Sequence, residues 1–328
     1  MIEIKYYSEQ YETFHAEFAK KYWKKERRFI PEYIYWKFRG SQEKELKSFI
    51  LAIEGEKVIG QFGLIPCEVL IDDELIEGQW ACDLMVDSDY RGKGVAEKLY
   101  DFAHQNKAIT LGSDPSPAAE KSMLKKGYLS LEGPRKFVFP VKIGEIFKLK
   151  GINNSFLNRL PNPFLVVLFF IKNSDYKLIN QREYSELNHY RVREQLYCNH
   201  DSSYYNWRFS AFKPYYQGIE CYQKDDFNFF SGYFINGLYF LTDFRANSLG
   251  SFLRMISFIY FKYRKSDIAR IKFVSMEDSK INRKLPFLGF VLFRTLTKVI
   301  MFTKDEKIKR SINKKKFYYT LHDSDENI

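Results

Sequence analysis

The sequence predicts a mixed α/β protein (α+β, with mixed sheets). It also predicts two tandem domains of similar fold. Strand-like apolar runs alternate with amphipathic segments, landmarks of the first half recur in the second, and 328 residues exceed one typical core. Hydrophobic residues form 45% of the chain and aromatic residues 18%, which favours packed cores over disorder. We expect a first domain over residues 1–145, a connecting segment over 146–187 and a second domain over 188–328.

The first half contains alternating strand and helix patterns. The expected strands are Ile2–Tyr6, Phe49–Ile53, Val58–Leu64, Pro66–Ile71, Leu75–Val86, Ala108–Gly112 and Lys136–Val141. The expected helices are Gln10–Lys25, a segment that begins at Val95, and Ala118–Lys126.

The second half repeats landmarks of the first in the same order, which indicates a diverged tandem duplication. The paired landmarks are Trp36-Lys37-Phe38 with Trp207-Arg208-Phe209, Asp83 with Asp243, and Gly127-Tyr128 with Gly289-Phe290. The aspartate precedes the glycine by 44 residues in the first half and by 46 in the second.

Several classes of protein are disfavoured by what the sequence contains. The four cysteines have no CxxC spacing and form no zinc pattern with the histidines, so we expect no metal and a reducing, cytoplasmic location. The N-terminus has no apolar signal-peptide core. Phe164–Ile171 is far shorter than the roughly 20 residues of a spanning helix, so no stable membrane insertion is expected. A buried helix start there is favoured over a membrane-surface contact.

The net charge of +11 favours an anionic partner. No helix-turn-helix, zinc-finger or RNP pattern is present, so nucleic acid is not expected. Solvated lysine-rich faces and polyanionic small molecules remain as explanations of the charge.

The most informative segment runs from Leu84 to Ala96, where a strand, a polar turn and two glycines lead into an amphipathic helix. Gly92 and Gly94 permit positive φ and close approach of a ligand to the backbone. Free N–H groups at a helix start bind phosphate, helped by the helix dipole. An ordinary strand-to-helix turn is the alternative. The Walker and GxGxxG patterns do not fit.

Arg91–Ala96 instead fits R/Q-x-x-G-x-G/A, and over roughly Ile2 to Pro140 the chain resembles the GNAT acetyltransferases. The resemblance implies acetyl-CoA as the acyl donor. The residues that it assigns to the pyrophosphate are Arg91, Gly92, Lys93, Gly94, Val95 and Ala96. It assigns the strand Leu84, Met85 and Val86 to pantetheine, and Ser113 to the neighbourhood of the acetyl end.

The mechanism that this resemblance implies is direct attack of a neutral amine on the thioester carbonyl. Asp83 is the local candidate for the proton acceptor, or for a residue that holds the ammonium; a purely structural aspartate is the alternative. Alternation along the strand places Asp83 and Met85 on one face, opposite Leu84 and Val86. The sequence departs from the family where a tyrosine often serves as general acid, because that position is Met123.

The second half lacks the phosphate loop. Its equivalent, Ala246–Ser251, has one glycine and no basic residue, so we expect a substrate-binding wall or a structural partner rather than a second CoA site. The candidate substrate contacts are Trp207, Arg208, Asp243, Asp323 and Asp325. For Trp207 and Arg208 the alternative is core packing. For Asp323 and Asp325 it is a frayed polar terminus.

A GNAT half followed by a degenerate one resembles bacterial N-acetyltransferases that modify nucleotide-linked amino sugars, such as dTDP-3-amino-3,6-dideoxyhexoses, for O-antigen and other surface polysaccharides, including lipopolysaccharide. It also resembles the Fem-type aminoacyl transferases, but the intact phosphate loop favours the first group. A peptide, polyamine or antibiotic amine as acceptor, and a non-catalytic CoA-binding protein, are the alternatives. We expect a monomer or weak oligomer.

Overall fold

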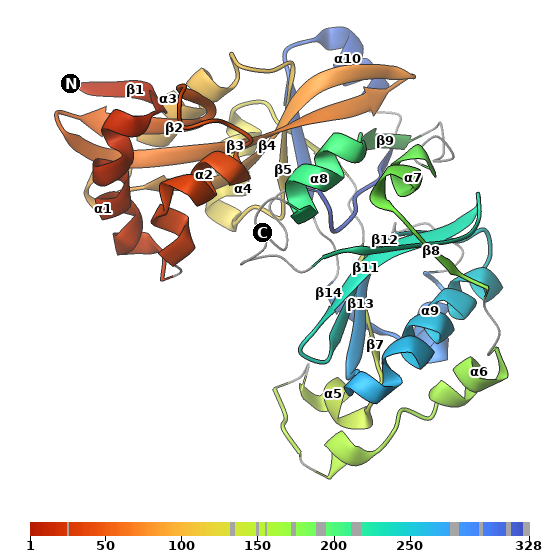
Figure 1. Cartoon of the computed structure of the whole chain (residues 1–328). Coiled ribbons are helices and arrows are strands. Elements are labelled where there is room, and N and C mark those ends of the chain that lie inside the picture. The colour runs from red at the N-terminus through yellow and green to blue at the C-terminus, as the bar shows by residue number, and fades with distance from the viewer. Residues whose placement is uncertain are drawn as a thin grey trace.

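The structure is a computed structural model. It describes residues 1–24, 26–131, 135–148, 151–154, 156–171, 175–187, 195–210, 218–275, 282–294, 298–312 and 316–323. Two separate β-sheets with helices packed on them form the two halves of the molecule (Figure 1). The mixed α/β class with two tandem domains is therefore confirmed.

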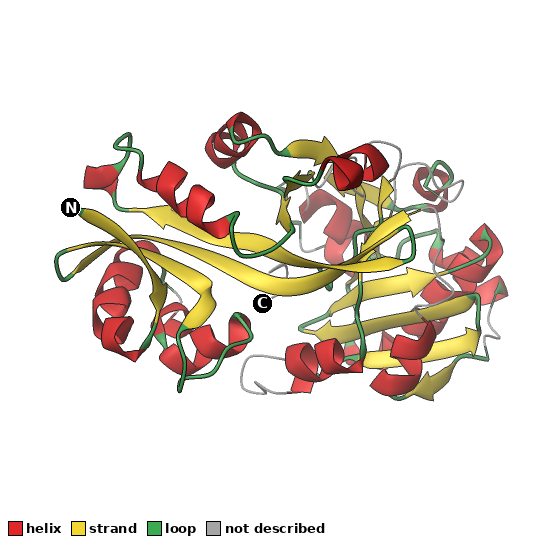
Figure 2. Ribbon diagram, turned by 90° about the horizontal axis from the view of Figure 1, so that it is seen from above, coloured by secondary structure: helices red, strands yellow, loops and turns green. Residues whose placement is uncertain are grey.

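The first sheet is mixed and contains the longest strands of the molecule. Its main path is β1 (Ile2–Tyr7), β2 (Leu46–Glu54), β3 (Lys57–Ile71), β4 (Glu74–Val86), β5 (Ile109–Ser113), β15 (Val299–Thr303) and β6 (Leu129–Leu131), and β9 (Gln195–Cys198) joins β3 and β16 (Lys316–Phe317). The expected strands Val58–Leu64 and Pro66–Ile71 are one continuous strand, whose long hairpin with β4 reaches toward the second half (Figure 2).

Helices cover both faces of this sheet. Helices α1 (Glu12–Tyr22) and α2 (Pro31–Lys37), joined through a short 3-10 turn η2 (Glu26–Phe29), lie on one face, and α3 (Val95–Ala103) and α4 (Pro117–Lys125) lie on the other (Figure 1). The α3 side holds a compact apolar cluster that includes Val95, Leu99 and Tyr100. Two buried layers therefore fix β4 from both sides.

The second sheet has the order β14–β7–β13–β12–β11–β10–β8. Its strands are β7 (Arg135–Pro140), β8 (Lys177–Ile179), β10 (Glu220–Asp225), β11 (Asn228–Ile235), β12 (Leu238–Arg245), β13 (Arg270–Ser275) and β14 (Val291–Arg294). The helices that follow β7 in the chain are α5 (Ile143–Lys148), α6 (Leu165–Phe170), α7 (Gln181–Glu186), α8 (Ser202–Ser210), α9 (Leu249–Tyr263) and α10 (Glu306–Ile312). Of these, α10 packs against the core of the first sheet through Ile308 and Ile312.

Each sheet takes a strand from the other half of the chain. Strand β7 precedes residue 145 yet lies between β13 and β14 of the second sheet. Strand β15 comes from the C-terminal part and lies between β5 and β6 of the first. The expected connecting segment also supplies β8, an edge strand of the second sheet. The domain limits that we expect at 145 and 188 therefore do not coincide with the membership of the sheets.

The repeated tryptophans meet at the junction of the two halves. Trp36 Nε1 donates to the carbonyl of Trp207 at 2.9 Å, and Trp207 Nε1 donates to the carbonyl of Trp36 at 2.6 Å. The two rings lie 5.9 Å apart. A reciprocal contact between equivalent residues is what two related halves facing each other would make, and it supports the duplication that the landmarks indicate.

One local expectation is wrong. The apolar run Phe164–Ile171 forms the short helix α6, but only Leu165 and Leu168 are buried, and most of its other large apolar side chains face outward. At the other end of the chain, β16 has only two residues. After β16 the chain instead bonds to both halves, with Tyr318 N donating to Leu196 O and Leu321 N to Thr242 O.

Candidate active site

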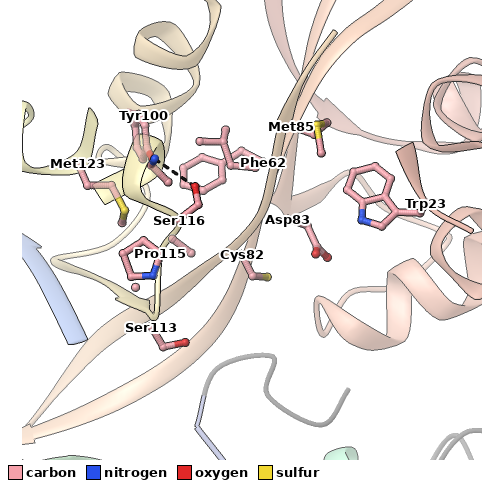
Figure 3. Close-up of a pocket in the computed structure, with 14 residues that line it drawn as sticks. Trp23, Phe62, Cys82, Asp83, Met85, Tyr100, Ser113, Pro115, Ser116 and Met123 are labelled. Carbon is pink, nitrogen blue, oxygen red and sulfur yellow. Dashed lines mark hydrogen bonds between the residues drawn. The ribbon is translucent and has the colours of Figure 1, made fainter. Parts of the chain in front are cut away.

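Strands β4 and β5 pair over a short stretch and then part. Their parallel pairing joins Gly78–Ala81 to Ile109–Gly112 and ends there, although β4 continues to Val86. The β5-facing edge of β4 beyond Ala81 therefore has no strand partner among the described residues. A cavity of about 300 Å³ lies at this divergence (Figure 3).

The cavity has walls from both sides of β4. Its lining residues are Trp23, Phe62, Ala81, Cys82, Asp83, Leu84, Met85, Tyr100, Gly112, Ser113, Pro115, Ser116, Ala119 and Met123. Figure 3 shows Trp23, Asp83 and Met85 on one side of the strand and Tyr100, Ser116 and Met123 on the other. A reactive group held between the parted strands is thus reachable from two directions.

A β-bulge interrupts β4 at the cavity. Cys82 pairs with Gly63 and Met85 with Gln61, so Asp83 and Leu84 together face the single residue Phe62. Asp83 adopts a left-handed φ of 51°, which is unusual for a residue with a side chain. Leu84 lines the cavity, and the pairing of β4 with β5 has ended before it.

The bulge also determines which side chains of β4 face α3 and which face α1 and α2. Ala81, Leu84 and Val86 pack toward α3, whereas Cys82 and Met85 pack with the core of α1 and α2. Asp83 points to that second side, as the strand alternation predicts for Asp83 and Met85 against Leu84 and Val86. Without the extra residue, Ala81 and Leu84 would face opposite ways.

Asp83 is held by two cations. Its Oδ2 accepts from Lys37 Nζ at 2.6 Å, and its Oδ1 pairs with Arg28 Nη1. The Lys37 side chain is 1% exposed. Burial raises the pKa of the Asp83 carboxyl, but the charges and hydrogen bonds of Lys37 and Arg28 outweigh burial and hold the pKa below its usual value. A carboxylate so strongly paired is a poor proton acceptor, which argues against the general base expected at Asp83.

A second set of contacts fixes the backbone at the bulge. Gln61 Nε2 donates to the Asp83 carbonyl at 3.1 Å, and Gln61 Oε1 lies 2.9 Å from His15 Nε2. Burial lowers the pKa of His15 to about 4, so the ring is neutral at neutral pH and can donate to the amide oxygen. Asp83 is therefore fastened through both its side chain and its carbonyl.

The phosphate loop has the open helix start that the sequence predicts. Gly94 is the N-cap of α3 with a φ of 78°, no side chain caps the helix, and Gly92 has a φ of 74°. The amides of Arg91 and Lys93 donate to Ser88 O and Tyr90 O within the turn. Within the described chain, those of Gly92, Gly94, Val95 and Ala96 have no protein acceptor. Four free donors at a helix start suit a diphosphate.

Basic side chains surround this loop. Lys57 and Lys93 lie over the Tyr90 ring, at 5.2 Å and 4.9 Å from its centroid. The Tyr90 hydroxyl donates to Glu54 at 2.6 Å, and Arg91 Nε donates to the Val86 carbonyl at 3.3 Å. These contacts hold cations beside the free amides, where a polyanion would be stabilised.

The equivalent helix start in the second half is closed. At α9 the N-cap is Ser248, whose hydroxyl accepts from the Ser251 amide at 3.1 Å. The Asn247 amide donates to Asn228 Oδ1 at 3.4 Å. Side chains of the protein occupy donors that stay free at α3, in agreement with the absence of the glycine-rich loop from Ala246–Ser251.

Tyr100 of α3 is the tyrosine among the residues that line the cavity. Burial together with the Glu97 carboxylate raises its pKa, so the hydroxyl stays protonated. Met123 also lines the cavity and carries no proton to donate. Tyr128, the aromatic residue of the Gly127-Tyr128 pair, instead packs away from the cavity with its hydroxyl 2.9 Å from His104 Nε2.

The candidate substrate residues of the second half do not line this cavity. Arg208, Asp243 and Asp323 are at most 3% exposed. Asp243 accepts from Tyr184 at 3.0 Å and Tyr318 at 3.3 Å. Their hydrogen-bonding capacity is used inside the protein, so the expected contact with substrate is not supported for these three side chains.

The other two candidates divide between the junction and the undescribed terminus. Trp207 is committed to the reciprocal contact with Trp36, and the Arg39 guanidinium lies 5.1 Å from its ring. Asp325 lies outside the described residues, as does part of the aromatic stretch Tyr204–Tyr216.

Comparison with known proteins agrees with this geometry. Residues 3–108 match the family model described as an acetyltransferase (GNAT) domain. The matched segment covers about a third of the chain and includes β1 to β4, α3 and the phosphate loop. GNAT enzymes use an acyl-CoA donor, and the parted strands, bulge and open α3 start are the features of this domain that fit one. A search of curated proteins gives no match.

Solved structures extend the likeness of fold to both sheets. A GCN5-related N-acetyltransferase from Anabaena variabilis ATCC 29413 has a TM-score of 0.58 at 13% identity, with 93% of this chain and 73% of that chain covered. N-myristoyltransferase from Saccharomyces cerevisiae, with bound myristoyl-CoA, has a TM-score of 0.56 at 12% identity over 92% of this chain and 82% of that one. At such identities the comparison establishes a shared fold.

Several cavity residues were not anticipated from the sequence. Trp23 lines the cavity from the end of α1, and Arg28 and Lys37 reach Asp83 from η2 and α2. All three lie far from the phosphate-loop motif in the chain. Tyr100 carried a usable signal, because it lies four residues after Ala96 and therefore one helical turn along α3 from the phosphate loop. The described residues contain no cluster of metal-binding side chains.

Replacing Gly94 tests the phosphate loop. We expect Gly94→Ala to weaken acetyl-CoA binding by about tenfold or more, because a Cβ intrudes where the diphosphate approaches and positive φ disturbs the free donors. Isothermal titration calorimetry measures the change. Gly55→Ala is the matched control: Gly55 has a φ of 63° in the β2–β3 turn and equally open surroundings, so it carries similar strain and should bind normally. Equal affinities for both variants would remove the loop from the binding site.

Replacing Asp83 tests its ion pairs. We expect Asp83→Asn to reduce the free energy of unfolding by about 3 kcal/mol at neutral pH, because Lys37 is left buried without its counter-ion. Urea denaturation of Asp83→Asn, Lys37→Met and the double variant should give a double-variant loss smaller than the sum of the singles. Since the folded pKa of Asp83 is depressed, the advantage of wild type should be present at neutral pH and vanish as pH falls through that pKa. Additive losses would mean that the pair is not coupled.

Proposed function

We propose that this protein is an acetyl-CoA-dependent N-acetyltransferase whose acceptor is the primary amine of a nucleotide-linked amino sugar. The observation that carries the transferase assignment is the cavity between the parted strands β4 and β5, next to a helix start with four free amides. The acyl donor would place its diphosphate at Gly92–Ala96 and its arm along the unpaired edge of β4.

The chain's own residues divide the chemistry between the two sides of β4. The amine attacks the thioester carbonyl from the side of Trp23 and Asp83, forming the C–N bond. The main chain at Leu84, in the part of β4 that has no pairing with β5, would stabilise the developing oxyanion. As the C–S bond breaks, the Tyr100 hydroxyl donates its proton to the thiolate and recovers one from solvent. The amine releases its proton to water, since Asp83 is neutralised by its two cations.

An anionic acceptor is supported by the charge on the open side of the cavity. Arg28 beside Asp83 is partly exposed at 17%, and the chain has a net charge of +11. A nucleotide diphosphate attached to the amino sugar would be attracted by this field. A polycationic acceptor such as a polyamine would be repelled by it.

The deciding assay follows CoA release with a thiol reagent. With acetyl-CoA and a panel of dTDP- and UDP-linked amino sugars, we expect turnover with at least one dTDP-3-amino-3,6-dideoxyhexose and no turnover with its N-acetylated form. Turnover only with peptide, polyamine or antibiotic amines would overturn the proposed acceptor but support the proposed acetyltransferase activity. Tight acetyl-CoA binding without turnover on any amine would indicate a CoA-binding protein.

Tyr100→Phe tests the proton donor. The ring is 1% exposed, and phenylalanine preserves its packing, so folding should be unchanged. We expect kcat to fall about 10²-fold with little change in the KM for acetyl-CoA, because only the transition state uses the proton. Tyr128→Phe is the control, since that hydroxyl lies outside the cavity. If the kcat of Tyr100→Phe equals that of wild type, Tyr100 is not the proton donor, and water would protonate the thiolate.

A further inference from the structure

The outer edge of the second half presents an unusual apolar surface. Its five side chains come from α6, the residue before it, and the 3-10 turn η7 (Leu285–Leu288). Phe170 is 87% exposed and Phe287 82%. The other members of this α6 surface are Phe164, Val166 and Phe169. Side chains of this size seldom gather on a face that stays in water.

The two segments that carry this surface lie next to each other. A Cβ at Gly289, the residue that ends η7, would lie 2.4 Å from the Phe164 ring, so η7 packs directly beside the start of α6. The Phe169 ring contacts Phe261 of α9 with centroids 5.1 Å apart. Figure 1 shows α6 and the chain that leads to it from α5 along the edge of the second half. Two further exposed apolar residues, Ile152 and Phe156, lie on that leading chain.

The outward orientation of α6 is fixed by its buried side. Leu165 and Leu168 belong to the core of the second half, and the Leu168 carbonyl accepts from Ser257 of α9 at 3.0 Å. Asn162 anchors the start of the helix, donating to Pro140 O at 2.7 Å and accepting from Phe164 N at 3.1 Å. Because these contacts fix the buried side of α6, its other side chains stay on the outer face.

The charges around the α6 surface are mainly of one sign. Among the described residues between 146 and 171, Lys148 and Arg159 are basic and none is acidic. On the neighbouring elements, Arg264 lies 5.2 Å from the Phe261 ring, and Arg283 and Lys284 are exposed before η7. Of the residues that the structure describes, the exposed acidic ones nearest in the chain are Asp175 and Asp267, and the latter is paired with Lys142.

We propose that the α6 surface binds the surface of an anionic lipid bilayer, with its aromatic side chains at the level of the headgroups. Exposed aromatic and aliphatic groups with a basic rim are the combination that interfacial segments use. The same charge disfavours a second copy of the chain as the occupant, because two such rims would repel each other. In the described part of the chain, no helix has the length and apolarity to cross a membrane, so the contact is peripheral.

This surface is separate from the active-site cavity. The cavity is lined from β3, β4, β5, α3 and the N-terminal helices, and the α6 surface belongs wholly to the second half. Membrane binding and acyl transfer to a dissolved acceptor should therefore respond to different substitutions. The proposal stands or falls independently of the proposed acceptor.

Vesicle co-sedimentation of the full chain tests the proposal. We expect wild type to bind vesicles of phosphatidylcholine mixed with phosphatidylglycerol, and phosphatidylcholine alone far more weakly. Phe170→Ser/Phe287→Ser should bind the anionic vesicles about tenfold or more weakly, since it removes the two most exposed rings and no core contact. Lys284→Gln/Arg264→Gln should lose the preference for anionic lipid. Leu75→Ser, at an apolar residue near the start of β4 that is 54% exposed, is the matched control and should bind as wild type.

Folding and self-association are read in the same preparations. Circular dichroism and acetyl-CoA binding should be the same for wild type and Phe170→Ser/Phe287→Ser. The proposal is overturned if wild type does not bind anionic vesicles, or if the double variant binds them as wild type does. It is also overturned if light scattering shows a dimer that the double variant abolishes while vesicle binding is absent, because the surface would then belong to a second copy.

Discussion

The parting of β4 from β5 is the constraint on which the site depends. Once the strands separate after Ala81, the free edge of β4 needs a shape that does not simply recruit another strand, and the bulge at Asp83 provides it. A residue with φ of 51° persists only if its surroundings hold it there. Lys37 and Arg28 hold the side chain and Gln61 holds the carbonyl. The ion pairs of Asp83 are thus best understood as support for the bulge.

Sequence patterns predicted the features that depend on residues close together in the chain. The hairpin of β2 and β3, the helix at Val95 and the open glycine start all follow from neighbouring residues, and the structure has them. The partners of Asp83 did not follow, because Arg28 and Lys37 lie 55 and 46 residues away and reach it only through tertiary packing. The exposure of α6 was missed for a related reason: an apolar run shows its hydrophobicity, but not whether the rest of the chain provides a cover for it.

The exchange of strands explains why the two halves behave as one molecule. Strand β15 completes the first sheet between β5 and β6, and β7 completes the second between β13 and β14. Neither sheet can therefore form fully without the other half of the chain. The strand that borders the cavity, β5, is itself held by β15, so the degenerate half contributes to the site by supporting its wall even though its own candidate side chains are buried.

The two helix starts differ in how their first amides are satisfied. At α3 the N-cap is a glycine, which leaves the first amides unsatisfied, and such groups are tolerated only if solvent or a ligand reaches them. At α9 the N-cap is Ser248, which satisfies one of those amides itself and stabilises the helix without a ligand. A serine N-cap satisfies one of the first N–H groups within the protein, whereas a glycine N-cap leaves these groups available to an anion. The half without the loop could therefore specialise in support and in its outer surface.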